Sequence, residues 1–556
     1  MAIDLSSMLL LIPLAPLLLL VAMALPGRRV GVARLAPVAV LPAVVVALGV
    51  PVGSVQPLPG APWAAGFGLD EPGRWLLLLG AVVWGCAAWF ATGWFREAGR
   101  MPLFMAFFLA AMAGFFGLVI ARDLPTFYLF FALMGFAGYG LVVHDGSWAA
   151  RRAGRLYLAM LMLGEISLFA GVALAASQAG ELVMPGFGGE WRPTVPTLAL
   201  LAVGFAIKAG VLGLHAWLPV AHPAAPVPAS AVLSGLMIKA GVLGWWRVWP
   251  EGAAPAGSGE VAAAVMALGV AAALYGAVVG VWQGRAKTVL AFSSVSQIGW
   301  LTLLTGVAMV GGGKAPLIQA VLLFFLAHHA LAKAALFLGA GLCLRARGVM
   351  ARRIWWGLWL PALALAGAPL TSGLLAKEAV ETALEARGLY DGLGPWLLAA
   401  SLGTTLLMGR FLWLLYPRGE PTPAAVPGPW RPWAVLTGAG LVLPWVAGAM
   451  LPAFPDAIPQ PGGALPSLGI LLAGGGVVVT LVRWPRERLL RRLARLRRAV
   501  AVWRRQRERR LRHWWRRGQT RALARERQLQ EWPLVGRGLM LLGVLLWLTG
   551  MLEGIR

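Results

Sequence analysis

The chain has 556 residues, of which 59% are hydrophobic and only 13% are charged, and its mean hydropathy is +0.76. A soluble domain carries about 25% charged residues, so this composition excludes a soluble enzyme and predicts an all-α polytopic membrane protein. The two cysteines, Cys86 and Cys343, stand far apart in apolar stretches without a CxxC motif, which excludes a disulfide framework and a zinc or Fe–S site within the chain. We therefore expect no cofactor in this chain, and any redox chemistry in a partner protein.

Windows of about 20 apolar residues predict about sixteen transmembrane helices. The N-terminus lacks a basic region ahead of its first apolar run, so we expect no cleavable signal peptide. In chain order, the predicted parts are spans 1–3 in residues 1–100, spans 4–8 in 101–250, spans 9–13 in 258–418, spans 14 and 15 in 430–483, a basic amphipathic segment in 484–531 and a terminal span in 534–552.

The basic residues indicate the topology of the chain. The formal net charge is +26, and +15 of it lies between Arg483 and Glu531, where 19 Arg accompany four Glu. Most of the remaining excess lies in short loops, such as those that hold Arg28, Arg151 and Arg345. By the positive-inside rule these loops face the cytoplasm, with the N-terminus outside. Because both flanks of the basic segment are tied into the membrane, we expect no nucleic-acid partner.

Residues 484–531 are too charged to span a membrane. Leu489, Leu493, Leu496, Val500 and Trp503 nevertheless recur at three- and four-residue spacing. This pattern predicts an amphipathic helix, about 70 Å long, along the cytoplasmic membrane surface. Two interpretations stay open: a basic helix that binds anionic lipid, and a strut across neighbouring subunits.

Lysines are the first candidate functional residues. The chain contains 42 Arg but six Lys, and four lysines lie inside predicted apolar spans: Lys208, Lys239, Lys333 and Lys377. Arginine is effectively always protonated, whereas burial away from water favours the neutral form of lysine and lets it release a proton. A buried charge is also costly, which makes these lysines functional candidates. Lys287 and Lys314, near span ends, are more typical of side chains that reach the interface.

Histidines and carboxylates accompany these lysines. His215 and His222 lie around the end of the seventh span, His328 and His329 lie mid-span, Glu378 follows Lys377, and Glu165 lies in the sixth span. Imidazole exchanges protons near neutral pH, so the array predicts a proton relay at membrane depth. Glu165 is expected to pair with a buried lysine or, alternatively, to bond two helices together. For His222, in a proline-rich turn, a structural role is equally open.

Two lysine-bearing spans contain helix-breaking residues. In the seventh span Lys208 is followed by Gly210 and Pro219, and in the twelfth span Pro369 and Gly373 precede Lys377. Broken helices in corresponding positions of two halves predict an inverted repeat with ion sites at the breaks. The two five-helix halves would be spans 4–8 and 9–13.

Four stretches together resemble one known family: 208–239 (KAGVLGLHAWLPVAHPAAPVPASAVLSGLMIK), 290–299 (LAFSSVSQIG), 328–341 (HHALAKAALFLGAG) and 372–378 (SGLLAKE). They are similar to the signature of the antiporter-like proton-translocating membrane subunits. That family includes the large pumping subunits of respiratory complex I, the large subunits of Mrp-type antiporters, and membrane subunits of group-four hydrogenases and formate hydrogenlyase. The resemblance covers about residues 100–415, and the HPAAP turn resembles the hydrogenase-type members most closely.

The resemblance implies fourteen core spans built as two inverted five-helix repeats, and the added surface helix and terminal span are similar to those of the distal, lateral-helix-bearing subunit. It implies that Lys208 is the central lysine of the seventh helix, Lys239 the relay residue of the eighth, His328 and His329 the histidines of the eleventh, and Lys377 the exit-side lysine of the twelfth. His215, Lys333, Glu165 and Glu378 complete the expected relay.

One position departs from the family pattern. The glutamate of the fifth helix, which in the family modulates the central lysine, should fall within Phe130–Met134, and its position is taken by Ala132. Either Glu165 on the next span supplies the carboxylate or the entry half has lost its switch. We favour Glu165, because an isolated Lys208 would tend to stay neutral.

The leading hypothesis is a proton-translocating subunit of a complex I-like or hydrogenase-like respiratory complex in a bacterial or archaeal cytoplasmic membrane. Its partners would be other membrane subunits and soluble redox subunits carrying Fe–S, flavin or NiFe centres, with anionic lipid at the basic helix. The alternative is a subunit of a Mrp-like cation/proton antiporter or of an inorganic-carbon uptake complex, without redox coupling. A third possibility is a structural anchor whose basic helix clamps its neighbours.

Overall fold

The computed structural model describes residues 5–25, 27–58, 65–95, 100–179, 182–189, 193–249, 258–310, 316–417, 428–451 and 453–454, with the single positions 469, 472 and 474. The chain divides into two compact units, Met1–Val478 and Val479–Arg556. The predicted lateral helix at 484–531 and the terminal span at 534–552 lie in the second unit and outside the described residues.

Up to residue 249 the described chain is helical apart from one short hairpin. The helices are α1 (Met8–Ala22), α2 (Arg29–Arg34), α3 (Leu41–Gly49), α4 (Glu71–Trp94), α5 (Met101–Ile120), α6 (Leu124–Val143), α7 (Trp148–Gln178), α8 (Val195–Ala209), α9 (Leu218–Ala224), α10 (Val227–Val232) and α11 (Lys239–Val248). Shorter turns are the 3-10 helices η1 (Leu5–Ser7), η2 (Ala36–Val40) and η3 (Pro185–Phe187) and the π-helix η4 (Leu233–Met237). Strands β1 (Val55–Pro57) and β2 (Gly66–Gly68) pair antiparallel.

From residue 258 onward the described elements are again helices: α12 (Ser258–Val281), α13 (Ala286–Met309), α14 (Pro316–Arg345), α15 (Gly348–Gly357), α16 (Trp359–Ala366), α17 (Ser372–Glu385), α18 (Tyr390–Leu415) and α19 (Trp430–Met450). Within the described ranges, eleven helical stretches are long and apolar enough to cross a membrane. Other predicted spans correspond to the shorter helix at Ala36–Gly49, to α8 with α9, and to α15–α17. The all-α polytopic class is confirmed, whereas the predicted fifteenth span, 466–483, lies mostly outside the described residues.

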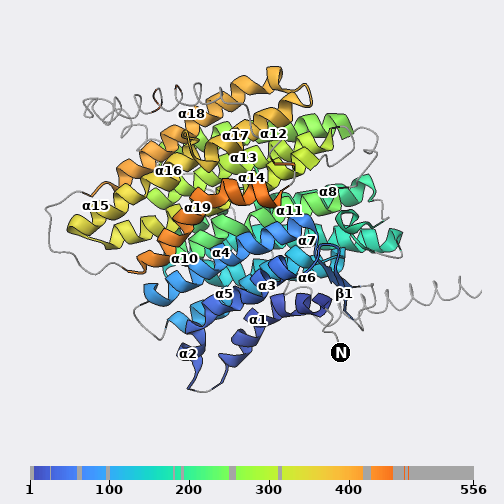
Figure 1. Ribbon diagram of the computed structural model, residues 1–556, viewed down its shortest axis with the longest axis horizontal. Helices are drawn as coiled ribbons and strands as arrows, with labels where there is room; N and C mark the ends of the chain where they lie inside the picture. The colour runs from blue at the N-terminus through green and yellow to red at the C-terminus, as the bar shows by residue number, and fades with distance from the viewer. Residues whose placement is uncertain are drawn as a thin grey trace, which may run out of the picture. The chain divides into compact units, whose positions relative to one another are not determined.

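The centre of the first unit is formed by α10–α11, α13 and α14. The apolar windows of Val227–Val248 and Pro316–Arg345 are completely buried, and that of α13 is nearly so. Figure 1 shows α14 and α11 in the middle, with the N-terminal helices α1–α3 on one side and α12, α17 and α18 on the other. Helix α14 contacts α13, α17 and α19 as well as α4 and α10, so it joins the earlier and later parts of the chain.

Helix starts follow the local sequence. Asp70 accepts a hydrogen bond of 2.9 Å from the Gly73 amide at the start of α4, and Ser147 accepts one of 3.1 Å from Ala150 at the start of α7. Asp123 caps α6 and also accepts from the Gly66 amide at 3.0 Å, which ties the hairpin to the helix end. These side chains satisfy amide groups that a helix leaves unpaired at its N-terminus.

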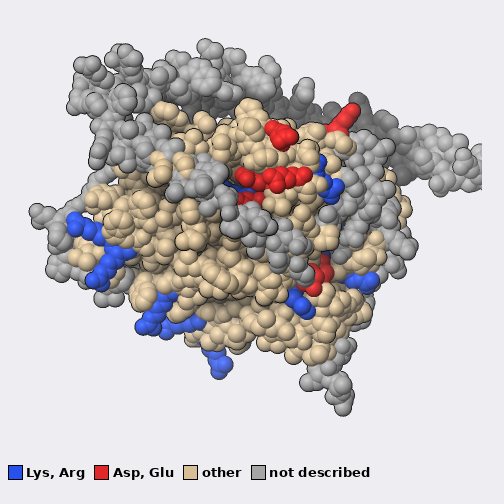
Figure 2. All heavy atoms as spheres, turned by 45° about the horizontal axis from the view of Figure 1, so that its top comes forward, with Lys and Arg blue, Asp and Glu red and all other residues tan. Residues whose placement is uncertain are grey.

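Basic residues gather at one end of the helices, here called the basic end, which holds Arg100, Arg285 and Arg345. Arg345 donates a hydrogen bond of 2.8 Å to the carbonyl of Trp94, and Arg100 donates one of 3.3 Å to the carbonyl of Asp145. Figure 2 shows that most of one described face carries neither basic nor acidic side chains, with several Lys and Arg side chains along its left and lower edge. This distribution is typical of a surface that faces lipid between two polar borders.

Candidate functional site

The seventh predicted span is broken directly after Lys208. Helix α8 ends at Ala209 because Gly210 takes a left-handed conformation, with a φ of 75°. The Val211 amide donates to the Ala206 carbonyl at 3.1 Å, the long bond of a Schellman motif. The indole of Trp217 donates a hydrogen bond of 2.9 Å to the carbonyl of Ile207. The break therefore places Lys208 in the last turn of a half-helix, where the helix dipole favours a cation.

Lys208 and Glu165 line the same cavity. Lys208 is 5% exposed and Glu165 4% exposed, and neither charged group has a hydrogen-bond partner among the described residues. A Cβ at Gly135 would lie 3.1 Å from Glu165 Oε1 and 3.4 Å from Lys208 Nζ. The cavity has room for a water molecule. It is lined by Phe131, Tyr157, Leu161, Gly164, Glu165, Gly204, Ile207, Lys208 and Trp217.

Helix α6 presents no acid to this cavity. The Phe131 ring lies 5.4 Å from Lys208 Nζ, and Gly135, one turn later, borders both charged groups. Ala132, where the family pattern predicts a carboxylate, is half-buried. The Tyr157 hydroxyl donates to the Gly135 carbonyl at 2.9 Å and so holds α7 against α6. The acid nearest to Lys208 in this arrangement is therefore Glu165 on α7.

Lys239 follows a π-helical turn in the middle of the eighth span. Its Nζ donates to the carbonyl of Ser234 at 2.5 Å, within η4. The wider π turn leaves carbonyl groups without their usual helical partners, and such turns are frequent at functional sites. Lys239 is 1% exposed, so this carbonyl stands in for water at its ammonium group.

Serines of α13 join Lys239 to Lys333. The hydroxyls of Ser234 and Ser294 are 2.8 Å apart, and Ser294 donates to the Leu290 carbonyl at 3.1 Å. Lys333 donates to that same carbonyl at 2.7 Å and also to the hydroxyl of Ser293. Two buried ammonium groups from α11 and α14 are thus linked by one hydrogen-bonded chain.

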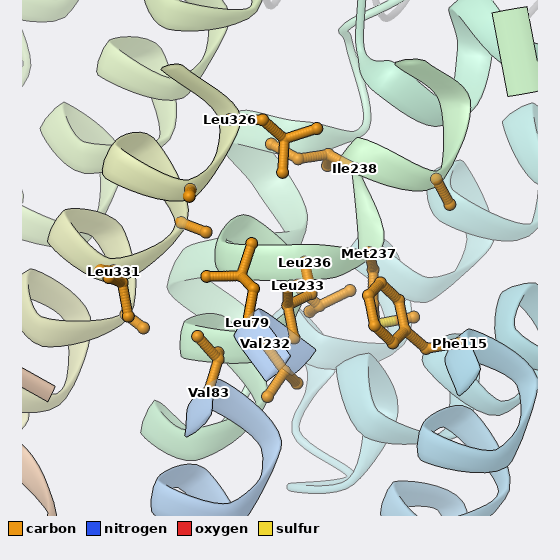
Figure 3. Packing of buried hydrophobic residues seen from close by; sticks show 14 of the residues in the cluster. Leu79, Val83, Phe115, Val232, Leu233, Leu236, Met237, Ile238, Leu326 and Leu331 are labelled. Carbon is orange, nitrogen blue, oxygen red and sulfur yellow. The ribbon is translucent and has the colours of Figure 1, made fainter. Parts of the chain in front are cut away.

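The opposite side of the π turn is closed by apolar packing. Figure 3 shows Leu233, Leu236 and Met237 packed against side chains of α4, α5 and α14. Those neighbouring side chains are Leu79, Val83, Phe115, Leu326 and Leu331. Such packing excludes water, so the polar groups of η4 and α11 connect only toward α13 and α14.

His328 and His329 lie on α14, in the interior. His328 Nδ1 is 2.9 Å from the hydroxyl of Ser372, the first residue of α17. His329 is fully buried, and neither of its ring nitrogens has a hydrogen-bond partner within the described part of the chain. A second cavity lies beside His328, between α14, α16 and α19, with Thr371 and Thr437 among its lining residues.

The twelfth predicted span is broken in the same way as the seventh. Helix α16 ends at Ala366, Gly367 has a φ of 86°, and the Ala368 amide donates to the Leu363 carbonyl at 3.0 Å. Lys377, on the following helix α17, reaches back and donates to the carbonyl of Ala366 at 2.6 Å. The ammonium group therefore caps the negative end of a half-helix. Glu378, the next residue, is also buried.

His215 stands apart from the Lys208 cavity. It lies in the connection between α8 and α9, is half-buried, and its ring contacts that of Tyr275 edge to face at 5.1 Å. The structure thus brings Glu165 together with Lys208, and Lys239 together with Lys333, whereas His215 lines neither cavity described above.

Sequence reasoning missed two features. One is the serine chain of α13, for which the signal was the Ser293–Ser296 stretch inside an apolar span. The other is an ion pair between Arg247, at the end of α11, and Asp70, before α4, with Arg247 Nη2 to Asp70 Oδ1 at 2.8 Å. Arg247 is completely buried and also donates to the Val119 carbonyl at 3.0 Å. No local spacing pairs residues so far apart in the chain.

The fold and these buried groups define a multi-pass helical membrane protein with lysines at two helix breaks. Residues 121–402 match the family model described as NADH:quinone oxidoreductase/Mrp antiporter, TM. The chain belongs to this family of antiporter-like membrane subunits.

Individual relatives agree with this assignment. The chain is 33% identical to hydrogenase-4 component B of Escherichia coli (strain K12) over 307 residues, which are 51% of this chain and 44% of that protein. It is 27% identical to a Na(+)/H(+) antiporter subunit of Alkalihalophilus pseudofirmus, over 57% of this chain and 67% of the relative. The chain thus spans about half the length of the hydrogenase component that it matches.

Two solved structures share the fold. A chain of the Mrp complex from Dietzia sp. DQ12-45-1b superposes with a TM-score of 0.68 at 22% identity, covering 85% of this chain and 100% of the other. A chain of the membrane-bound sulfane sulfur reductase, an archaeal respiratory membrane complex, gives a TM-score of 0.66 at 18% identity, with 84% and 99% covered. At these identities the likeness concerns the fold.

Proposed function

We propose that this protein is a proton-translocating subunit of a complex I-like or hydrogenase-like membrane complex. The observation that carries the proposal is the cavity shared by Glu165 and Lys208 at the end of the half-helix α8. A carboxylate and an ammonium group without direct bonds can exchange a proton through water at low cost in geometry. Ionisable groups at this depth in a membrane protein are expensive and mark ion pathways.

The proposed relay runs along the buried lysines and histidines. A proton enters near His215 and exchanges on Lys208 under the influence of Glu165. It then passes Lys239 and Lys333, reaches His329 and His328, and leaves past Lys377 and Glu378. The hydrogen bonds through Ser234 and Ser294, and the contact between His328 and Ser372, support the later steps of this order.

The proposed architecture is two inverted five-helix halves, spans 4–8 and 9–13, within about sixteen spans. It is supported by the identical hydrogen-bond pattern of the two breaks, Val211 to Ala206 and Ala368 to Leu363. The N-terminus would face outward and the basic end inward, in a bacterial or archaeal cytoplasmic membrane. Residues 484–531 would form the lateral helix, on the cytoplasmic side and against anionic lipid.

The proposed partners are other membrane subunits and soluble redox subunits with Fe–S, flavin or NiFe centres. The similarity to hydrogenase-4 component B supports this choice. A second candidate is cation/proton exchange without redox coupling, which the similarity to the Na(+)/H(+) antiporter protein of Alkalihalophilus pseudofirmus favours. In both cases the same buried groups would carry the proton.

The test has two stages, and the first is purification from the native membrane in mild detergent, followed by mass spectrometry of all bound proteins. We expect redox subunits. A partner set of small antiporter subunits, or of a zinc-containing carbon-uptake protein, would favour the alternative functions.

The second stage measures proton movement in inverted vesicles from the native host, with a fluorescent reporter of the pH gradient. Movement is driven by the partner reaction or, for exchange, by added Na⁺ or K⁺. We expect Lys377→Ala to abolish proton movement while the complex still assembles. Undiminished movement in Lys377→Ala and Lys208→Ala would overturn the relay.

A further inference from the structure

His222 is a buried imidazole without an assigned role in the relay above. It lies on α9, is completely buried, and neither ring nitrogen has a hydrogen-bond partner among the described residues. Its ring stacks on Phe337 of α14, with centroids 4.9 Å apart. A buried polar group without partners costs free energy, so its presence calls for an explanation.

The surroundings of His222 connect it to the basic end. Lys287, in the first turn of α13, donates to the carbonyl of Ala225 at 2.5 Å, three residues after His222. The Ser230 hydroxyl donates to the His222 carbonyl at 2.9 Å, which fixes the turn that carries the imidazole. Lys287 is half-buried and lies within electrostatic reach of Asp145, an exposed carboxylate in the turn after α6. Lys287 therefore stands between the surface and the interior.

On its inner side, His222 faces the centre of the relay. Phe337, on which the imidazole stacks, lies one helical turn from Lys333 on α14. Leu290, whose carbonyl accepts from Lys333, lies one turn from Lys287 on α13. The ammonium groups of Lys287, Lys333 and Lys239 all act electrostatically on the His222 ring.

Three cations around one imidazole restrict where protons reside. Like charges disfavour one another at close range in a medium of low dielectric constant. A protonated His222 is therefore tolerated only while a neighbouring lysine is neutral. This condition makes protons move one at a time, each transfer requiring that the next group has already released its proton.

We propose that Lys287 and His222 form the proton inlet of the second half, leading from the basic end to Lys333. A neutral Lys287 takes a proton from bulk water and passes it to one ring nitrogen of His222. The other ring nitrogen releases a proton through intervening water to neutral Lys333, so one proton enters and one leaves. The inference rests on the proposed function, with Lys208 acting as the switch that sets when Lys333 is neutral.

The test uses two variants that keep the local contacts and remove proton exchange. In His222→Phe the ring still stacks on Phe337, and in Lys287→Arg the cation and its bond to Ala225 remain, but arginine does not release its proton. A neighbouring control is Gly284→Ala, because a methyl group there meets no atom within 4 Å. Proton movement is measured in inverted vesicles of the native host, with assembly followed by co-purification.

We expect proton movement to fall about tenfold or more in His222→Phe and in Lys287→Arg, the scale of losing a proton-transfer group. It should fall likewise in Lys377→Ala and stay unchanged in Gly284→Ala. If His222→Phe and Lys287→Arg keep wild-type movement while Lys377→Ala loses it, the inlet is overturned and the relay stands. If all keep it, both fail. Should His222→Phe not assemble, His222→Gln takes its place with the same expected loss.

Discussion

Glu165 on α7 and Lys208 on α8 border one small cavity, and no hydrogen bond joins them. Both groups are almost completely buried, and Gly135 of α6 leaves the space between them open. A direct ion pair would hold both charges in place, whereas this separation leaves Lys208 free to exchange its proton. The first predictions concern this pair.

A carboxylate at the cavity is expected to be necessary, whichever helix supplies it. We predict that Glu165→Gln lowers proton movement about tenfold or more, because Lys208 loses the charge that favours its protonated form. Adding Ala132→Glu, which restores the acid of the family pattern on α6, should recover part of the activity. Proton movement in inverted vesicles provides the measurement. Full activity in Glu165→Gln alone would show that this half works without a carboxylate.

Lys208 is expected to act by releasing a proton, beyond carrying a positive charge. Lys208→Ala should abolish proton movement and leave the set of co-purified subunits unchanged. Lys208→Arg should also abolish it, because arginine keeps the charge but does not give up its proton. If Lys208→Arg pumps normally, a fixed charge is sufficient and proton exchange at this position is refuted.

Gly135 is expected to keep the space between the two charged groups open. In Gly135→Ala the new methyl group would lie 2.7 Å from Leu161 Cδ1 and 3.1 Å from Glu165 Oε1, so both side chains must shift. We predict a severalfold fall in proton movement. The control is Gly164→Ala in the same cavity wall, where the nearest atom, Ile207 Cγ2, is 3.4 Å away. An equal effect of both substitutions would contradict the role given to Gly135.

Gly367 is expected to serve both the helix break and Lys377. Alanine in the left-handed region costs about 1 kcal/mol. At Gly367 it would also place a methyl group 3.0 Å from Lys377 Nζ. Gly388→Ala shares the backbone cost, with a φ of 64°, but meets no atom within 4 Å. Both variants should lower the Tm of the purified complex, and only Gly367→Ala should also lower proton movement; loss of movement in both would point to backbone strain alone.

The pair formed by Arg247 and Asp70 is expected to stabilise the contact between α4 and α11. Asp70→Asn leaves a completely buried guanidinium group without its counter-ion, which costs about 3 kcal/mol. Arg247→Met should cost less, because Asp70 is 18% exposed and keeps access to water. The double variant should resemble Arg247→Met. Denaturation midpoints of the purified complex check this order, and equal losses in the two single variants would contradict it.

The sequence by itself determined the class of protein. Apolar runs of membrane-spanning length and scarce charges leave helices as the only economical way to satisfy the backbone, so most spans were predictable within a few residues. Gly210 and Gly367 also predicted the two helix breaks, because glycine readily takes the left-handed conformation that ends a helix. The buried lysines were predictable as candidates, since a charge inside an apolar run needs a function.

Only the tertiary structure decided how these candidates are grouped. It brought Glu165 to the Lys208 cavity, joined Lys239 to Lys333 through serines, and set His222 between Lys333 and the basic end. The sequence assigns each residue to a helix and a depth, but the side on which two helices meet depends on packing among several helices. Hydrogen bonds and ion pairs across 40 to 177 positions, such as Lys333 to Ser293 and Arg247 to Asp70, exist only once that packing is complete.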